Sequence, residues 1–439
     1  MKKVNTAKIK LWDNDVGAVT WVADNDYAII EYEPSFLKKG LDISPIRMSI
    51  EQAKNSDGRF FFSSLNKETF LGLPGLLSDA LPDKFGNIII DSWLARKGRD
   101  AESFSPIERL CYMGKRGVGA LEFSPTITDK FDKSISVEIS NLVKLAKDII
   151  AERETLNTSF SSSEKANEEA ILDILRVGTS AGGARAKAVI AMNKDGDILS
   201  GQTEAPNGYD YWILKFDGVN DVELGKTENY GRIEYAYYKM AQKAGIDMSE
   251  CRLLEENGRA HFMTKRFDRI DGKKIHMQSL CGIAHYDFNM AGAYSYEQAF
   301  AIMRKLRLSK SEVTQQYRRM IFNVVARNQD DHTKNISFLM KEDGKWELSP
   351  AYDVIYSHKP GGKWTSKHQM TLNGKRDDFV INDLIEIGKS NGINKCENII
   401  KKVINAVSDW KNHAKKAGLK GNIISELGKY HRIQDFKSI

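Results

Sequence analysis

Residues 328–335 read Asn-Gln-Asp-Asp-His-Thr-Lys-Asn, and residues 350–353, beyond an apolar run, read Pro-Ala-Tyr-Asp. Asp330, Asn335 and Asp353 thus occur in the order of the groups that support phosphoryl transfer in protein kinases. In those enzymes a catalytic-loop Asp accepts the proton of the substrate hydroxyl. An Asn further along the loop then binds Mg²⁺ together with an Asp on a following strand. The stretch therefore points to a phosphoryl-transfer site.

The sequence between these residues predicts a hairpin that returns Asp353 to the loop. Residues 336–340 are strand-like, and Glu342-Asp343-Gly344-Lys345 is a turn sequence before a second strand at 346–348. Carboxylate and amide oxygens are the hard ligands that Mg²⁺ prefers. For the Asp-Asp-His-x-Lys-Asn motif alone, an alternative stays open: a polar hairpin loop in which Asp and Asn serve only as caps.

Composition restricts the class of protein. The chain has 439 residues, 41% hydrophobic and 28% charged, a balance typical of globular proteins. No apolar stretch approaches the roughly 20 residues of a membrane-spanning helix, and the first residues do not form a signal-peptide core. We therefore expect a cytoplasmic protein that does not bind membranes. The net charge of +6 is modest and does not by itself indicate nucleic-acid binding.

The four cysteines are far apart in the sequence and form no Cys-x-x-Cys pair. They are Cys111, Cys251, Cys281 and Cys396. This spacing suggests neither a zinc site nor a disulfide framework, so we expect buried thiols.

Apolar patterning divides the chain into three expected domains, at residues 1–140, 141–270 and 271–439. The first contains short strands and one helix, expected at 7–12, 26–32, 117–123 and, for the helix, 88–94. A helical pattern at 142–156 precedes the Ser-rich stretch 157–167, which is expected to be a linker. A sheet follows, with strands expected at 188–192, 211–216 and 260–267 and a helix at 233–244. Helices then dominate, at 296–306, 310–326 and 394–413.

A glycine-rich turn at 177–184 stands at the start of the sheet in the second expected domain. Its glycines permit close backbone approach, and their N–H groups suit phosphate oxygens. The spacing is not that of a Walker A loop. A tight turn without a ligand is the structural alternative, but kinases place a Gly-rich cover over the nucleotide at this point.

Tyr211-Trp212-Ile213-Leu214-Lys215-Phe216 places a lysine on an apolar strand. In kinases a strand Lys contacts nucleotide phosphates and pairs with a helix Glu, and Glu234 on the next helix is a suitable partner. The alternative is an exposed strand lysine that alternates with buried Leu214 and Phe216.

These motifs resemble the HipA-type serine/threonine kinase toxins of bacterial type II toxin-antitoxin modules. The resemblance covers nearly the whole chain. It is carried by 73–83 and 112–122 in the first region and, in the core, by 180–187, 265–269, 331–335 and 348–353. It implies an α+β, two-lobed protein-kinase-like fold with an N-terminal small-sheet subdomain and an all-helical C-terminal lobe. The main departure is Lys265, where the family's better-known member has an acidic residue, and 217–231 cannot be aligned position by position.

The resemblance also implies roles for individual residues. Asp330 would be the catalytic base, Asn335 and Asp353 the Mg²⁺ ligands, and Ser180 an autophosphorylated residue whose modification inactivates the enzyme. A phosphoserine would add nearly two negative charges to a loop that receives phosphates. ATP would be bound by a larger set: Lys215, Gly182, Gly183, Lys187, Glu234, Lys265, Phe267, His332 and Tyr352.

The leading functional hypothesis is an ATP- and Mg²⁺-dependent serine/threonine protein kinase toxin. As the resemblance implies, it would phosphorylate a translation-related protein such as an aminoacyl-tRNA synthetase. It would also bind a small helix-turn-helix (HipB-like) antitoxin and meet DNA only through that partner. Two alternatives stay open: a catalytically idle corepressor that acts with its DNA-binding partner, and a small-molecule or lipid kinase.

Overall fold

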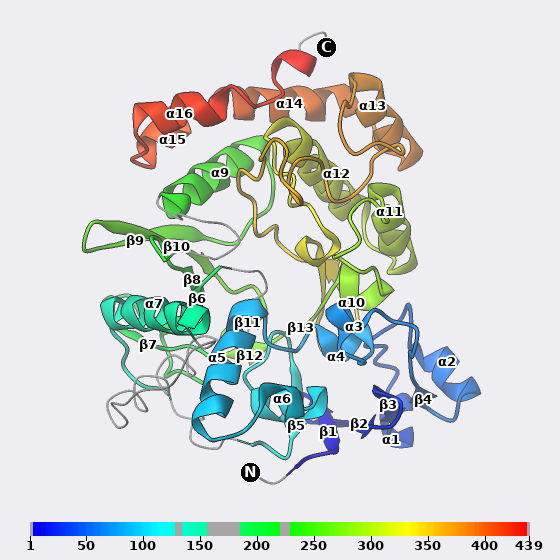
Figure 1. The fold of residues 1–439 in the computed structure, drawn as a ribbon. Coiled ribbons are helices and arrows are strands. Elements are labelled where there is room, and N and C mark those ends of the chain that lie inside the picture. Colours follow the sequence, from blue (N-terminus) through cyan, green and yellow to red (C-terminus); the bar gives the residue numbers. More distant parts are fainter. Residues whose placement is uncertain (1–2, 128–133, 156–184, 220–228, 437–439) are drawn as a thin grey trace.

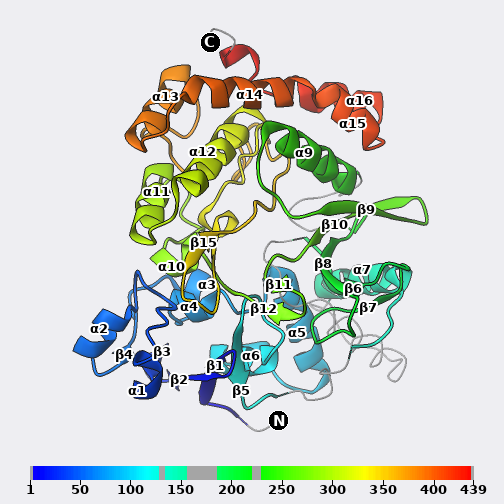
Figure 2. The ribbon, with the colours of Figure 1, turned by 180° about the vertical axis from the view of Figure 1, so that it is seen from behind.

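The computed structural model describes residues 3–127, 134–155, 185–219 and 229–436. An N-terminal sheet with its helices lies at one end of the molecule, and the last helices of the chain lie at the opposite end (Figure 1). A second sheet and the other helices of the second half of the chain lie between these two ends. The view from behind shows the same order of parts (Figure 2).

The N-terminal sheet is antiparallel, with strand order β4-β3-β2-β1-β5. Side chains alternate along β1, where Ala7, Ile9 and Leu11 are buried, as expected for a strand with one face in a core. The strands are β1 (Thr6–Leu11), β2 (Asn14–Val22), β3 (Tyr27–Tyr32), β4 (Arg59–Phe60) and β5 (Leu121–Ser124). The strand β2 was not expected, because Asp15 and Gly17 interrupt its apolar pattern.

Helices either pack against this sheet or lead from it to the next part of the molecule. α6 begins with a capping box between Ser105 and Glu108 and has Pro106 in its first turn. The helices are α1 (Pro34–Leu37), α2 (Ile50–Asn55), α3 (Lys67–Phe70), α4 (Gly75–Ser78), α5 (Lys84–Arg96), η1 (Ala101–Ser103) and α6 (Pro106–Met113).

The second sheet is also antiparallel, with strand order β7-β6-β8-β10-β9. One apolar core joins β6, β8 and β10 to α7 and to α5, through Phe85, Ile89, Leu142, Ala188 and Trp212 among others. α5 belongs to the first expected domain but shares the core of the second. The elements are α7 (Ile139–Thr155), β6 (Lys187–Met192), β7 (Ile198–Ser200), β8 (Asp210–Lys215), β9 (Cys251–Glu256) and β10 (Arg259–Lys265).

The helix α9 (Tyr230–Ala244) connects this sheet to the helical lobe. Gly231 approaches β10 so closely that a Cβ there would lie 2.0 Å from the carbonyl oxygen of Ala260. The helix ends at Gly245, which adopts a left-handed φ of 85° as a C-terminal cap. Its apolar face, with Ala236, Tyr237 and Met240, belongs to the core of the helical lobe.

The last part of the chain is mostly helical, and its largest core spans 233–436. The two-lobed fold class is confirmed, with one correction: this lobe is not all helical. β13 (His276–Ser279), β14 (Ser337–Met340) and β15 (Trp346–Leu348) form a small antiparallel sheet, because the predicted hairpin 336–348 pairs with the segment that enters the lobe. A separate hairpin joins β11 (Arg269–Ile270) and β12 (Lys273–Lys274).

The helices expected at 296–306 and 310–326 are present, the stretch 394–413 is two helices, and the helices at 280–284, 381–390 and 421–428 were not expected. The helices of this lobe are α10 (Leu280–Ala284), α11 (Tyr296–Lys305), α12 (Lys310–Val325), η3 (Thr333–Asn335), α13 (Ile381–Ser390), α14 (Cys396–Ser408), α15 (Trp410–Lys416), α16 (Gly421–Gly428) and η4 (Gln434–Phe436). All four cysteines are free thiols in buried positions, as expected. Among the described residues, none of the helices has the length and apolar character needed to cross a membrane. The expected linker 157–167 lies outside the described residues.

Candidate active site

Lys215 stands between two carboxylates, at the end of β8. Its Nζ lies 2.5 Å from Glu234 Oε1 on α9, and it also forms an ion pair with Asp353 Oδ1. The side chains of Lys215 and Glu234 are 14% and 2% exposed, so the pair is largely removed from water. The predicted pairing of strand lysine and helix glutamate is present in the structure. The exposed-lysine alternative is therefore excluded.

Electrostatics keep this cluster charged. Burial alone would lower the pKa of Lys215, but Asp353 and Glu234 beside it raise that pKa above its usual value. For Asp353, burial favours the neutral acid, whereas Lys215 and Lys187 hold the pKa of the carboxyl below its usual range. At neutral pH the site therefore presents a cation flanked by carboxylates. A lysine cation held in this way can bind the anionic phosphates of a nucleotide.

Asp353 adopts a left-handed backbone conformation, with φ of 50°. Residues other than glycine are uncommon there, and such outliers often occur at functional sites. The preceding residue, Tyr352, is held in place, because its Oη lies 2.5 Å from both Ser337 Oγ and the carbonyl oxygen of Lys334. Since Lys334 precedes Asn335, these contacts hold the two predicted metal ligands on neighbouring stretches of backbone.

The loop between α12 and β14 carries the predicted catalytic residues. Asn335 Nδ2 donates to the carbonyl oxygen of Asp330 at 2.8 Å, which closes the loop around residues 330–335. The Asp330 side chain is 49% exposed, and its Oδ1 lies 3.8 Å from His332 Nε2. The His332 ring packs beside Phe288, with ring centroids 5.4 Å apart. Asp330 is therefore positioned by its backbone while its carboxylate faces solvent, as a base for an incoming hydroxyl requires.

Asp331 is a buried structural anchor beside Asp330, and its sequence neighbourhood did not predict this position. Its carboxylate accepts hydrogen bonds from Tyr296 Oη at 2.7 Å and from the Gln369 backbone N–H at 2.8 Å, and it pairs with His368 Nδ1 at 2.8 Å. Burial would raise the pKa of Asp331, but His368 and these donors hold it below the usual range. The sequence signal that could have indicated this anchor is the adjacent pair Asp330-Asp331. One of these two carboxylates faces solvent, and the other is buried.

The expected hinge follows β10. Lys265 points to Asp210, with Nζ 2.7 Å from Oδ1, and the Arg266 backbone N–H donates to the Tyr211 carbonyl oxygen at 2.8 Å. The ring of Phe267 lies 5.6 Å from that of Tyr352, between centroids. Phe267 and Tyr352 are thus neighbours beside Asp353, as an adenine-binding hinge near the metal ligands would require.

Asp268 ties this hinge to the N-terminal region. Its carboxylate pairs with Arg266 and Arg269 at 2.7 Å and accepts the Gly119 backbone N–H at 2.9 Å. Burial would raise the pKa of Asp268, but the two guanidinium groups hold it far below its usual range. Arg269 also donates to the carbonyl oxygens of Gly117 and Gly119. The sequence motif at 112–122 is therefore a support for the hinge.

Three predicted residues of the glycine-rich turn, Ser180, Gly182 and Gly183, lie outside the described residues. The two cations that follow are described. Arg185 Nη1 lies 3.8 Å from Glu234 Oε2, and its guanidinium stacks over the Tyr230 ring at 4.1 Å. Lys187 forms a buried ion pair with Asp83 at 3.0 Å, which caps α5. Lys187 thus forms an ion pair with a carboxylate of the N-terminal region. In the pairing of β6 with β8 it lies opposite Lys215.

The residues fit a nucleotide with a divalent cation. Donation through Nδ2 leaves the Asn335 amide oxygen able to face a cation, and Asp353 keeps its second carboxylate oxygen, Oδ2. Such oxygens are the donors that Mg²⁺ prefers. Two buried polar atoms, Glu234 Oε2 and His332 Nδ1, form no hydrogen bond within the described part of the chain. Among the described residues there is no group of three or more His, Cys, Asp or Glu side chains that could hold a metal ion by itself.

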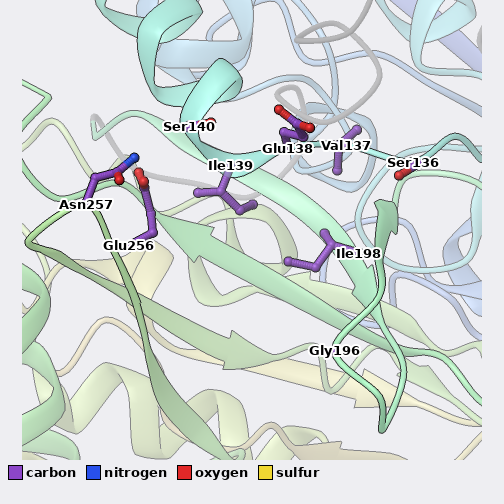
Figure 3. Close-up of a pocket in the computed structure, with 9 residues that line it drawn as sticks. All are labelled: Ser136, Val137, Glu138, Ile139, Ser140, Gly196, Ile198, Glu256 and Asn257. Atoms are coloured by element: carbon purple, nitrogen blue, oxygen red, sulfur yellow. The ribbon is translucent and has the colours of Figure 1, made fainter.

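A separate shallow pocket of about 340 Å³ lies where α7 begins, beside the hairpins β6–β7 and β9–β10 (Figure 3). Its lining comes from 136–140, Gly196, Ile198, Glu256 and Asn257, and none of the predicted site residues is among them. This pocket is not part of the candidate active site.

Comparisons with known proteins establish the family. The HipA-like C-terminal domain matches residues 179–411, more than half of the chain, and the HipA N-terminal domain matches residues 7–124. The chain therefore belongs to the HipA family.

The individual relatives share limited sequence identity with this chain, over part of its length. The chain is 28% identical to "Putative kinase Y4mE" of Sinorhizobium fredii over 141 residues, which cover 30% of this chain and 32% of that protein. It is 25% identical to a "Putative kinase" of Haemophilus influenzae over 205 residues, 39% of this chain and 58% of that protein. The matches thus span about one third to three fifths of these relatives.

A solved structure matches almost the whole chain. It is that of HipA from the toxin-antitoxin system of Shewanella oneidensis MR-1, in complex with HipB and its operator DNA. The TM-score is 0.64, with 15% sequence identity, and the match covers 98% of this chain and 97% of that chain. At this identity the likeness concerns the fold.

Proposed function

We propose that the protein is an ATP- and Mg²⁺-dependent serine/threonine protein kinase and the toxin of a toxin-antitoxin module. The observation that carries the proposal is the position of Lys215, which pairs with Glu234 on α9 and with Asp353 beside the catalytic loop. In kinases, a strand lysine, a helix glutamate and a metal-binding aspartate act together in the same kind of arrangement. Family membership and relatives named as kinases support it.

Each residue has a role that its surroundings allow. Lys215, held by Glu234, would orient the nucleotide phosphates, and the hinge at 265–267 with Tyr352 would border the adenine. Asn335 and Asp353 would hold Mg²⁺, which neutralises charge on the phosphate oxygens when it is bound with ATP. Asp330, with its exposed carboxylate, would accept the proton of the acceptor hydroxyl. Positioning and electrostatics supply most of such catalysis.

The proposed partners follow from the family. The Shewanella oneidensis HipA is seen with HipB and operator DNA, which supports a small helix-turn-helix antitoxin as the partner of this chain and contact with DNA only through it. The proposed substrate is a cytoplasmic protein of translation, such as an aminoacyl-tRNA synthetase. We also propose that Ser180 is autophosphorylated and that this modification switches the enzyme off.

The test is transfer of label from γ-labelled ATP in the presence of Mg²⁺, with separate protein, small-molecule and lipid acceptors. Wild type should label protein at serine or threonine, as phosphoamino-acid analysis would report, and Asp330→Asn and Asp353→Asn should not. Label found only in small molecules or lipids would support the alternative kinase. Equal labelling by Asp330→Asn would exclude the proposed base.

A further inference from the structure

The loop that follows Asp353 is fastened to both neighbours of the proposed catalytic base. At its start, Ser357 is bridged to the catalytic loop: its N–H donates to the Arg327 carbonyl oxygen at 3.0 Å, and its own carbonyl oxygen accepts the Gln329 N–H at 3.1 Å. The His358 ring then meets the Gln329 side chain. Residue 329 immediately precedes Asp330.

The same loop ends on the other side of Asp330. His368 and the Gln369 backbone N–H both bind the buried carboxylate of Asp331, each at 2.8 Å. The loop 357–369 therefore begins beside residue 329 and ends beside residue 331. Both ends of the loop are therefore anchored beside Asp330, the residue proposed to meet an acceptor hydroxyl.

The loop displays positive charge. Residues 354–376 contain Lys359, Lys363, Lys367, Lys375 and Arg376 and no Asp or Glu. Lys375 pairs with Asp383, and Arg376 donates to the His368 carbonyl oxygen, so these two are engaged within the fold. Lys359, Lys363 and Lys367 are exposed, and none of them forms an ion pair with a carboxylate in the described part of the chain.

An exposed tryptophan accompanies these lysines. Trp364 is 44% exposed, and its backbone carbonyl oxygen accepts a bond from the Gln369 side chain, whose residue is itself anchored to Asp331. Lys363 Nζ lies 4.8 Å from the centre of the Trp364 ring. Partly exposed tryptophans are frequent anchors in protein–protein interfaces. We call residues 357–369, with these lysines and Trp364, the basic loop.

We propose that the basic loop is the docking surface for the phosphoacceptor, and that it selects a polypeptide segment with acidic residues beside its serine or threonine. This inference rests on the proposed kinase function. Three cations on a short exposed loop complement a few carboxylates within a Debye length of about 8 Å. A nucleic acid is a poorer fit, because its binding relies on an extended series of phosphate contacts, whereas this surface offers three lysines and one aromatic ring.

The first measurement is binding, which does not depend on catalysis. A fluorescent serine peptide with glutamate flanks should bind the full-length protein more tightly than the same peptide with glutamine flanks. The triple variant Lys359→Gln, Lys363→Gln, Lys367→Gln should bind the acidic peptide about 10-fold more weakly, as three exposed charge pairs would give. The variant Lys401→Gln, Lys411→Gln, Lys415→Gln loses the same net charge from exposed positions and should bind like wild type.

The second measurement is phosphorylation of the two peptides. Preference for the acidic peptide should appear in KM and should disappear in the basic-loop variant. Equal binding of both peptides, or unchanged preference in that variant, would overturn the inference. Tighter binding of an RNA homopolymer than of polyglutamate, lost in the same variant, would reassign the surface to nucleic acid. Absence of all phosphate transfer, including at Ser180, would contradict the kinase proposal alone, because the binding result would still decide the docking surface.

Discussion

His368 Nδ1 lies 2.8 Å from Asp331 Oδ2, and this buried contact fastens the segment after Asp353 to the loop that carries Asp330. Removing the charge leaves His368 and two further donors around a neutral group. We expect Asp331→Asn to lower the free energy of unfolding by about 3 kcal/mol. We also expect it to reduce phosphoryl transfer, because Asp330 is held by its neighbours. Urea unfolding with activity assays would check both. Asp330→Asn is the control, since its half-exposed side chain should leave stability unchanged.

The stability difference between wild type and Asp331→Asn should depend on pH. The pKa of Asp331 is lower in the folded protein than the value of about 3.9 for an unfolded chain. A lowered pKa stabilises the fold above the unfolded value, and this contribution is lost as the pH falls through the folded pKa. The difference should therefore be constant near neutrality and shrink below about pH 4. A difference that grows on acidification would show that Asp331 is not held as a carboxylate.

Lys215→Met should reduce phosphoryl transfer by about 10²–10³-fold, the usual loss when a preorganised charged group at the reacting centre is removed. Glu234 and Asp353 would also lose their shared partner. Nucleotide binding by titration calorimetry and initial rates would separate the effects on affinity and rate. Lys411→Met, at an exposed position on α15, is the matched control. Comparable activity in both variants would exclude Lys215 from the site.

Gly75→Ala should separate the N-terminal region from the helical lobe. A Cβ at Gly75 would lie 2.1 Å from the backbone carbonyl oxygen of Gly282 on α10 and 2.7 Å from the His285 ring. We expect a loss of about 3 kcal/mol in stability and lower activity, because α10 packs beside the catalytic loop. Thermal unfolding would measure it, with Gly421→Ala as the control, since a Cβ there meets nothing within 4 Å. An unchanged Tm would mean that this contact is not needed.

Much of the fold and the core of the site could be predicted because their signals are local. The hairpin 336–348 follows from two strand patterns around a Gly-containing turn, and Glu234 follows Lys215 on the next helix. The order of Asp330, Asn335 and Asp353 was readable because loop and hairpin are contiguous. Their proposed chemical roles stay predictions.

The contacts that support the site could not be read from sequence, because they join distant segments. His368 and Asp331 are separated by 37 positions, and nothing in either local pattern indicates the partner. The ion pair of Lys187 with Asp83 of the N-terminal region could not be foreseen either, since packing of α5 on the sheet brings that carboxylate to it. The proposed contact of Lys187 with the nucleotide stays a prediction. The strand β2 was missed because a glycine required by close backbone approach breaks its pattern.

Self-phosphorylation can be measured directly as the intact mass of the purified protein before and after incubation with ATP and Mg²⁺, for wild type and Asp330→Asn. Wild type alone should gain one phosphate, mapped by peptide sequencing to Ser180. The same gain in Asp330→Asn would contradict the proposed base. No gain in a wild-type protein whose starting mass carries no phosphate would contradict the proposed self-modifying kinase.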